Sequence, residues 1–290
     1  MKDFYLPAET QIAYANLIVA SMTRALSFYK DKLGLQVIHR QNGTAILSSS
    51  QSQPSALILT EDREAEPKPP STTGLYHVAI RFPNRAGLGR ALQGLIQQGW
   101  RFIGAADHGV SEAIYTVDPD GNGLELYADK PRSVWPRKNG QIAMVSDPLD
   151  LNNLLNSAGD VRENAHPGIG VGHIHLQVGD LDRSRAFYRD LLGLEVTQED
   201  FHGALFLAAG KYHHHIGLNI WAGKGAPRPP ANSVGLKSFG LRVPDRTSRN
   251  LLADRVREAG LPVEEKQDPL SSQKSLLFHD PDGNGVELLI

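Results

Sequence analysis

The chain repeats itself, and this repeat constrains its fold more than any other feature of the sequence. The segments TRALSFYKDKLGLQV at 23–37 and DRSRAFYRDLLGLEV at 182–196 are identical at eight of fifteen positions. A second pair, DPDGNGLELY at 118–127 and DPDGNGVELL at 280–289, is identical at eight of ten positions. The offsets between the copies are 159 and 162 residues. Because self-similarity at a fixed spacing is the signature of duplicated structural units, we expect two halves of similar build.

Each half divides again into two shorter units with the same order of elements. An extended segment opens each unit, and a segment with helical spacing follows it, as Leu88, Leu92 and Leu95 illustrate. Three further extended segments complete each unit, and the repeated DPDGNG sequence is a turn between strands. The expected opening strands and helices are 12–19 with 22–33, 76–82 with 85–99, 172–178 with 182–192, and 236–243 with 245–259. The sequence therefore predicts an α+β chain of four βαβββ modules.

Composition excludes several classes of protein. The net charge of −2 lacks the basic footprint of a nucleic-acid binder, so no nucleic-acid partner is expected. The chain has no cysteine, so any metal must be held by His, Asp, Glu or Tyr. No apolar run approaches the ~20 residues that span a bilayer, and the N-terminus lacks the apolar segment of a signal peptide. We therefore expect a cytoplasmic protein with no membrane partner.

The module pattern and the F-Y-x-D-x-L-G-L run resemble the vicinal-oxygen-chelate superfamily, which includes glyoxalase I, fosfomycin-resistance proteins, bleomycin-binding proteins and type I extradiol dioxygenases. The resemblance covers nearly the whole chain. It implies that modules pair into two cupped-sheet domains, with metal ligands on the first and last strands of paired modules. On this pattern, modules 1 and 2 occupy 10–127, a proline-containing linker occupies 128–170, and modules 3 and 4 occupy 171–290.

The positions at which this superfamily holds its metal differ among the modules. Module 1 offers Tyr14 or Asn16 on its first strand, and its last strand offers no central ligand. Module 4 has Ser238 where a histidine would stand but keeps Glu287 on its last strand, and Leu277 stands where the extradiol family has a tyrosine. Modules 1 and 4 therefore lack a complete set of ligands.

The complete ligand sets lie in modules 2 and 3. Module 2 offers His77 on its first strand and Glu125 on its last. Module 3 offers His173 and His175 on its first strand, and the run 213–215 lies on its last strand. Two histidines and one carboxylate form the facial triad of non-haem Fe(II) oxygenases, which leaves open positions for a chelating substrate and O2. We therefore expect His77, His173 and Glu125 to hold the metal.

The extradiol dioxygenases match this chain more closely still, in particular the bacterial catechol-2,3-dioxygenase group. Gly172-His173 resembles the family's metal-binding G-H strand, and HHHIGL at 213–218 resembles its H-H-x-I-x-L strand, which places His214 at the acid–base position. In module 2, Tyr115 and the Pro119–Gly121 turn precede Glu125 as in the family. The resemblance implies a substrate-binding role for Tyr115. His108 lies in a stretch like the family's Asp-His segment, and His108 and His215 complete the candidate catalytic set.

This chain departs from the usual order of the family, in which modules 3 and 4 form the catalytic pair. Here the residues predict that module 2 pairs with module 3, and module 1 with module 4. A rival triad of His173, His215 and Glu287, within the C-terminal half, stays open. His108 and His175 are candidates to orient a ligand histidine, and at least one of the three consecutive histidines is expected to face the site.

The resemblance implies a non-haem Fe(II) extradiol dioxygenase, and the same ligands suit Mn(II). Its partners would be O2 and a small aromatic diol, either a catechol or a hydroquinone. The first alternative is a metal-dependent lyase or isomerase of glyoxalase type, which would use two glutamate ligands. The second alternative is a non-catalytic small-molecule binding protein without metal ligands. A homo-oligomer is compatible with the sequence.

Overall fold

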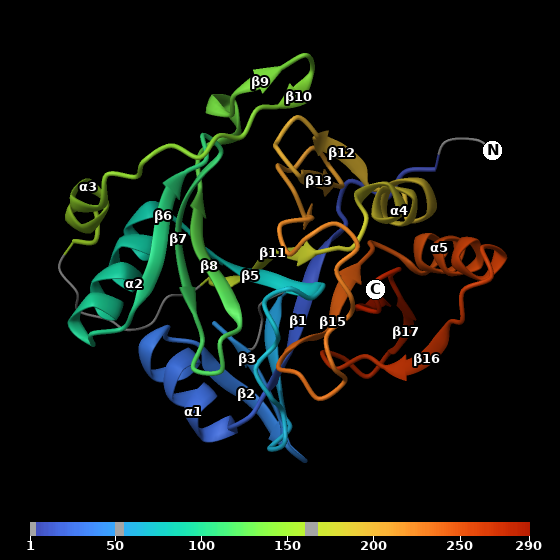
Figure 1. The fold of residues 1–290 in the computed structure, drawn as a ribbon, viewed down its shortest axis with the longest axis horizontal. Coiled ribbons are helices and arrows are strands. Elements are labelled where there is room, and N and C mark those ends of the chain that lie inside the picture. Colours follow the sequence, from blue (N-terminus) through green and yellow to red (C-terminus); the bar gives the residue numbers. More distant parts are fainter. Residues whose placement is uncertain (1–3, 50–54, 160–167) are drawn as a thin grey trace.

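The computed structural model describes residues 4–49, 55–159 and 168–290, and its strands form two eight-stranded sheets (Figure 1). One sheet, here named the 2/3 sheet, takes its strands from modules 2 and 3, and the other, the 1/4 sheet, from modules 1 and 4. The 2/3 sheet has the order β12 (Glu195–Gln198), β13 (Ala204–Ala208), β14 (Ile216–Asn219), β11 (Gly170–Gln177), β5 (Gly74–Phe82), β8 (Gly123–Asp129), β7 (Ser111–Val117), β6 (Phe102–Asp107). The 1/4 sheet has the order β16 (Glu264–Gln267), β17 (Lys274–His279), β18 (Gly285–Leu289), β15 (Gly235–Arg242), β1 (Gln11–Val19), β4 (Ala56–Glu61), β3 (Thr44–Ser48), β2 (Gln36–Gln41).

The strand order confirms the predicted pairing of module 2 with 3 and of module 1 with 4. At the centre of each sheet, the first strands of the two modules run antiparallel, β5 beside β11 and β1 beside β15. The predicted α+β fold of cupped sheets built from four modules is therefore confirmed. Each sheet combines one module from each half of the sequence, so the chain passes from one sheet to the other within each half.

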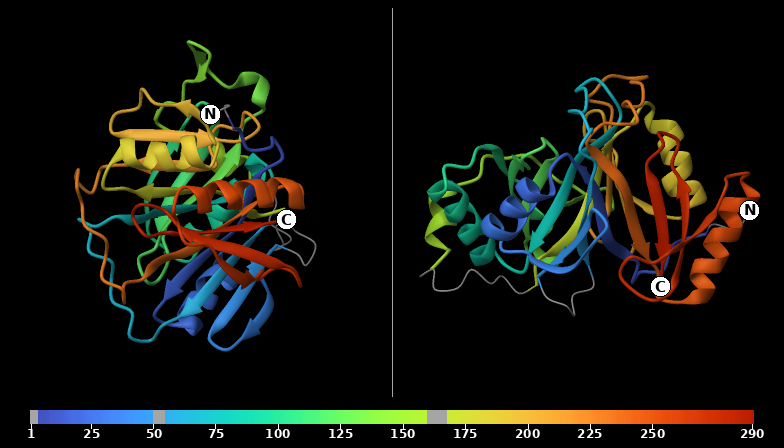
Figure 2. Two further views of the ribbon diagram at one scale, coloured as in Figure 1. Left: turned by 90° about the vertical axis from the view of Figure 1, so that its right-hand side faces the viewer. Right: turned by 90° about the horizontal axis from the view of Figure 1, so that it is seen from below.

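Helices flank the sheets on two sides. The helices α1 (Met22–Leu26), α2 (Arg85–Gln97) and α3 (Leu151–Asn156) lie on one side of the molecule, and α4 (Leu181–Arg185) and α5 (Arg246–Glu258) lie on the other (Figures 1 and 2). The Asn84 side chain caps α2 by accepting a hydrogen bond from the Gly87 N–H. Leu92 of α2 and Val256 of α5 belong to one apolar core shared by both sheets. Within the described residues, no helix is both long and apolar enough to cross a membrane.

The predicted helices at 22–33 and 182–192 both change from α- to π-geometry along their length. The π segments are η1 (Ser27–Lys32) and η3 (Ala186–Leu191). In η1, the N–H of Leu33 donates to the carbonyl oxygen of Phe28, five residues back, at 3.1 Å. In this wider turn the adjacent rings of Phe28 and Tyr29 are both buried. The repeated F-Y sequence therefore marks a π-helical segment rather than a uniform α-helix.

The predicted linker contains several short elements and helps to enclose a site. It contains a 3-10 turn, η2 (Arg132–Val134), the small ribbon of β9 (Arg137–Lys138) and β10 (Gln141–Ile142), and α3. A Cβ atom on Gly89 of α2 would lie 2.6 Å from the carbonyl oxygen of Leu154, so glycine permits the close contact of α2 and α3. A second contact ties the linker to β6, the edge strand of the 2/3 sheet. The N–H of Asp107, the last residue of β6, donates to the Asp147 carbonyl oxygen at 2.9 Å.

Candidate metal centre

Three neighbouring strands of the 2/3 sheet bring the predicted ligands together around one small residue, Ala79. In the sheet register, Ala79 on β5 is paired with Glu125 on β8 and with His173 on β11. His77 lies two residues before Ala79 on β5 and therefore points to the same face of the sheet. The small Ala79 side chain leaves the space above the strand to the three larger ones. The alternation of strand residues thus explains why the predicted triad assembles.

The atoms of this cluster have the separations that a metal site requires. The Nε2 atom of His77 lies 2.9 Å from Oε2 of Glu125, and the Nε2 atom of His173 lies 3.2 Å from the same oxygen. All three residues are buried, and their ligand atoms lie within 4.8 Å of one another. Adjacent ligands at ~2.1 Å from one metal ion are about 3 Å apart. The arrangement therefore fits a divalent metal held by two imidazoles and a carboxylate.

A buried nitrogen without a hydrogen-bond partner supports the same fit. His77 Nε2 is close to Glu125, but among the described residues it has no partner in hydrogen-bond geometry. A buried polar atom left without a partner costs about 1–3 kcal/mol. A metal ion bound at this nitrogen would supply the missing interaction.

The protonation states of the cluster also suit a metal. Burial lowers the pKa of His173 to about 4, so the imidazole is neutral at pH 7. Burial alone would raise the pKa of Glu125, but its interactions with His173 and His77 outweigh burial and hold the pKa well below its ordinary value. Metal ligands must be deprotonated, and His173 and Glu125 already are.

A second group of buried histidines lies nearby but fits a metal less well. The ligand atoms of His173, His213 and His214 also lie within 4.8 Å of one another. Both ring nitrogens of His213 are already occupied, Nε2 by Asp129 Oδ1 at 2.9 Å and Nδ1 by His214 Nδ1 at 2.9 Å. This group also has no carboxylate to offset the charge of a metal. We therefore assign the candidate centre to the cluster that contains Glu125.

A cavity of about 240 Å³ adjoins the cluster, and several predicted site residues line it. Among them are Tyr115, His108, His175 and His214. Apolar and aromatic side chains form much of the remaining wall, namely Tyr76, Met144, Val145, Phe201, Phe206 and Trp221. The cavity is thus a small, partly open space, and two of the candidate metal ligands, His77 and Glu125, form part of its wall.

Hydrogen bonds fix the proton positions on Tyr115 and His108. The Nδ1 atom of His108 lies 2.7 Å from the Val145 carbonyl oxygen, which can only accept, so Nδ1 carries the proton. The Nε2 atom of a neutral His108 is then an acceptor, and it receives the hydroxyl proton of Tyr115 across 2.6 Å. The lone pairs of the Tyr115 oxygen stay available to a ligand in the cavity. Burial raises the pKa of Tyr115 well above its ordinary value, so its hydroxyl keeps its proton.

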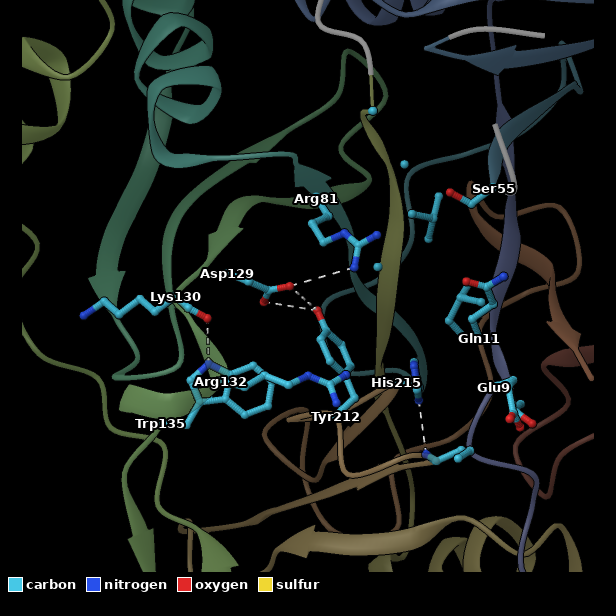
Figure 3. Close-up of a pocket in the computed structure, with 18 residues that line it drawn as sticks. Glu9, Gln11, Ser55, Arg81, Asp129, Lys130, Arg132, Trp135, Tyr212 and His215 are labelled. Carbon is cyan, nitrogen blue, oxygen red and sulfur yellow. Dashed lines mark hydrogen bonds and ion pairs between the residues drawn. The ribbon is translucent and has the colours of Figure 1, made fainter. Parts of the chain in front are cut away.

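The three consecutive histidines lie just before β14, and the prediction that they belong to this strand is wrong. Residues 213–215 lie outside regular strand geometry, and Lys211 just before them adopts a positive φ of 57°. Strand alternation therefore does not set the directions of the three side chains, which diverge. The ring of His214 lies with its centroid 4.0 Å from that of His173, at the edge of the cavity. Burial lowers the pKa of His214 well below its ordinary value. His215 instead lines a second cavity (Figure 3).

His175 lies beside the candidate ligands without joining their group. It is paired with His77 in the sheet register, and the two ring centroids are 4.9 Å apart. Its Nε2 atom lies 3.0 Å from the amide nitrogen of Asn219, which donates to it. Asn219 therefore holds the His175 ring at the wall of the cavity.

The structure does not bring together the rival triad of His173, His215 and Glu287. Glu287 lies in the 1/4 sheet, where it accepts hydrogen bonds from Ser238 at 3.3 Å and Ser275 at 3.0 Å. In that sheet Gly240 takes the place of Ala79, because it is paired with both Tyr14 and Glu287. In the 1/4 sheet, hydrogen-bonded side chains therefore occupy the positions that the candidate metal ligands have in the 2/3 sheet.

Several residues of the site went unrecognised in the sequence. Met144 and Val145 come from the linker, and no local pattern marks them as part of a cavity wall. Trp221 follows the strand that begins after the three histidines, and an aromatic residue directly after a candidate ligand strand was a usable signal. Asp129, the partner of His213, ends the strand of Glu125 and lies four residues beyond it.

Two cupped sheets with a His–Glu–His cluster in one of them define a protein of the vicinal-oxygen-chelate type. The chain belongs to the Glyoxalase/Bleomycin resistance protein/Dioxygenase superfamily, whose model matches residues 11–126 and 170–288. It is 45% identical to catechol-2,3-dioxygenase of Bacillus subtilis (strain 168) over 271 aligned residues. The aligned region covers 89% of this chain and 92% of that protein. The predicted enzyme class, a dioxygenase, is thereby confirmed.

Solved structures show the same fold at low sequence identity. A Bacillus subtilis protein superposes with a TM-score of 0.69 at 14% identity, over 98% of this chain and 86% of that one. Glyoxalase I from Zea mays superposes with a TM-score of 0.59 at 19% identity, over 97% of this chain and 92% of that one. These likenesses concern the fold alone.

Proposed function

We propose that this protein is a non-haem Fe(II) extradiol dioxygenase that opens the ring of a catechol. One observation carries the proposal: the cavity beside the His77–Glu125–His173 cluster also contains His214 and Tyr115, two groups suited to handle the protons of a diol. A lyase or isomerase of glyoxalase type would need a second carboxylate, and the described cluster holds one. A passive binding protein would need no such cluster.

The ligand set supports iron, and Mn(II) would take the same donors. His77, His173 and Glu125 would hold the ion beside the cavity. When bound, the ion would supply charge stabilisation for an ionised diol and a template for the two substrates.

The chain's own residues would move the protons. His214, a buried neutral imidazole, would take a proton from the diol and return one during ring opening. Tyr115 would accept a hydrogen bond from the substrate, because its own proton is donated to His108. The aromatic wall of Phe201, Phe206 and the neighbouring side chains would exclude water from the reacting ring.

The overall reaction balances without a further reductant. The carbon–carbon bond next to one hydroxylated carbon breaks, and both oxygen atoms of O2 enter the product. Catechol would give a ring-opened hydroxy acid semialdehyde that contains every atom of catechol and O2. The aromatic ring is oxidised and O2 is reduced.

The cavity supports a neutral substrate of small size. No lysine or arginine belongs to the described residues that line the cavity, so a carboxylate substituent on the ring would find no lysine or arginine partner there. A volume of about 240 Å³ accommodates catechol and catechols with a small apolar substituent. We therefore propose catechol and its alkyl or halogen derivatives as the substrate class.

Oxygen uptake tests the proposal directly. The metal-free protein is reconstituted with Fe(II) under anaerobic conditions, mixed with catechol, and exposed to oxygen in a closed electrode cell. We expect uptake of O2 together with a yellow ring-opened product. His214→Gln, which keeps a polar side chain in the cavity, should lower kcat by roughly 10²–10⁴-fold with little change in iron content. No oxygen uptake with any catechol or hydroquinone by an iron-loaded protein would rule the proposal out.

A further inference from the structure

A short chain of hydrogen bonds leads from His214 to a carboxylate outside the cavity. The Nδ1 atom of His214 lies 2.9 Å from Nδ1 of His213, and the Nε2 atom of His213 lies 2.9 Å from Oδ1 of Asp129. His213 is buried, and its main-chain carbonyl oxygen accepts a hydrogen bond from Thr197 Oγ1 at 2.6 Å. Hydrogen bonds therefore hold His213 at both its backbone and its side chain.

The order of donors and acceptors along these hydrogen bonds determines which nitrogen carries each proton. A carboxylate only accepts, so His213 must donate from Nε2 to Asp129. A neutral imidazole has one N–H, so the Nδ1 atom of His213 is an acceptor. The short Nδ1–Nδ1 contact then requires that His214 donate from Nδ1. Neutral His214 is left with a lone pair on Nε2.

We propose that Asp129 is a positioning residue that acts through His213 to hold His214 in its Nδ1–H tautomer, with an unprotonated Nε2 for the substrate. The inference rests on the proposed function, because it assigns the base atom of the acid–base histidine. Without the carboxylate, either nitrogen of His213 could carry the proton, and the other tautomer of His214 would place an N–H where the base must be. A carboxylate orients the histidine in Ser-His-Asp sites in the same way.

The surroundings of Asp129 keep its carboxylate in one place. Tyr212 donates its hydroxyl to this carboxylate, with distances of 3.2 Å and 3.0 Å to the two oxygens. Tyr127 lies 2.8 Å from the Tyr212 oxygen and donates to it, because the Tyr212 proton is already used. Arg81 lies on the other side, 3.9 Å from Oδ2 of Asp129 (Figure 3). These contacts restrain the acceptor on which the proton order depends.

Asp129 also borders a different cavity from the one that holds His214. This second cavity, of about 290 Å³, is lined by Asp129, Tyr212 and His215 among others (Figure 3). Asp129 is a quarter exposed there, whereas His213 is fully buried. Asp129 would therefore act on the tautomer of His214 from the second cavity, through the buried His213.

Nitrogen NMR can read the tautomer without any turnover. The protein is labelled with ¹⁵N-histidine and loaded with Zn(II), which is diamagnetic, and long-range ¹H–¹⁵N correlations identify the protonated nitrogen of each ring. We expect an Nδ1–H, Nε2-unprotonated pattern for His214 and an Nε2–H pattern for His213. A protonated Nε2 on His214 would overturn the proposal, and so would a His213 ring that is protonated at both nitrogens.

Substitutions separate positioning from a purely structural role. Asp129→Asn should add the other tautomer of His214 to the spectrum and lower kcat by about 10- to 100-fold in the Fe(II) enzyme, with KM within about threefold. Asp129→Glu should restore the wild-type pattern at least in part. Tyr212→Phe removes another partner of the same carboxylate and should leave the His214 pattern unchanged. An unchanged His214 pattern in Asp129→Asn would overturn the proposal.

Failure of the dioxygenase proposal would give a different result. A wild-type enzyme that is inactive on every diol would remove the proposed function while the tautomer pattern could still be read. If Asp129→Asn does not fold, the wild-type spectrum alone decides.

Discussion

Tyr188 donates a hydrogen bond to Asp280 across the two sheets, with 2.8 Å between its hydroxyl oxygen and Oδ2 of the carboxylate. Tyr29 donates to Asp118 in the same way at 3.0 Å. Each tyrosine comes from an F-Y-x-D-x-L-G-L run, and each aspartate opens a DPDGNG turn. The two repeated motifs therefore tie together the modules of one sequence half, which lie in different sheets. This explains why both motifs occur in both halves, although the metal ligands gather in one sheet.

These ties should contribute measurably to stability. Tyr188→Phe removes the hydroxyl and leaves the buried carboxylate of Asp280 with fewer donors, so we expect a loss of about 1–3 kcal/mol in the free energy of unfolding. Urea denaturation measures this loss. Tyr5→Phe is the matched control, because Tyr5 is exposed and should change the free energy of unfolding by less than about 0.5 kcal/mol. Equal effects of the two substitutions would show that the cross-sheet bond contributes nothing.

The two DPDGNG-x-E sequences allow a matched test of the metal site. Glu125→Gln should weaken binding of the metal by more than about 100-fold, because it removes the carboxylate of the proposed triad. Glu287→Gln changes the same position of the other repeat, where serines already bind the carboxylate, and should leave the metal affinity within about threefold. Metal titration of the two purified variants measures both affinities. Loss of metal in Glu287→Gln but not in Glu125→Gln would place the metal in the 1/4 sheet.

Stability should fall with decreasing pH because of His215. Burial lowers the pKa of His215 to about 3 in the folded protein, against about 6.5 in the unfolded chain. Because the folded pKa is the lower one, the unfolded state takes up the proton first as the pH decreases. The stabilising contribution is thus complete above pH 6.5 and is lost as the pH falls from there toward 3.

At pH 5 the loss due to His215 alone should be about 2 kcal/mol relative to pH 8. Urea denaturation of the metal-free protein at both pH values measures it. His215→Gln keeps a hydrogen-bonding side chain for the Ala209 N–H, which His215 Nδ1 accepts at 3.2 Å, but it cannot titrate. The variant should therefore lose about 2 kcal/mol less than the wild type. Parallel losses in the two proteins would contradict this account.

The sequence could predict those parts of the site that depend on local pattern. His77 and Glu125 were accessible because strand residues alternate between faces and because short motifs mark the first and last strands. The pairing of modules 2 and 3 was predictable because modules 1 and 4 lack ligands at the expected positions, as Ser238 illustrates. Met144 and Val145 were not accessible, because their place beside the cavity depends on the path of a linker that carries no periodic pattern. The divergence of the three histidines depends on the irregular backbone just before β14, which no local pattern in the sequence marks.

The substrate cavity should discriminate strongly between charged and uncharged diols, because no lysine or arginine is among the described residues that line it. A substituent carboxylate buried in this cavity would lose its hydration without gaining a cationic side chain, at a cost of several kcal/mol. We therefore expect kcat/KM for 3,4-dihydroxybenzoate to be at least about 100-fold lower than for 3,4-dihydroxybenzamide, which has nearly the same size and no charge. Initial rates of oxygen uptake with the two compounds measure the ratio, and 4-methylcatechol serves as the apolar reference. Similar kcat/KM values for the acid and the amide would mean that the substituent points out of the cavity or meets a cation outside it, and the proposed preference for neutral catechols would then be wrong.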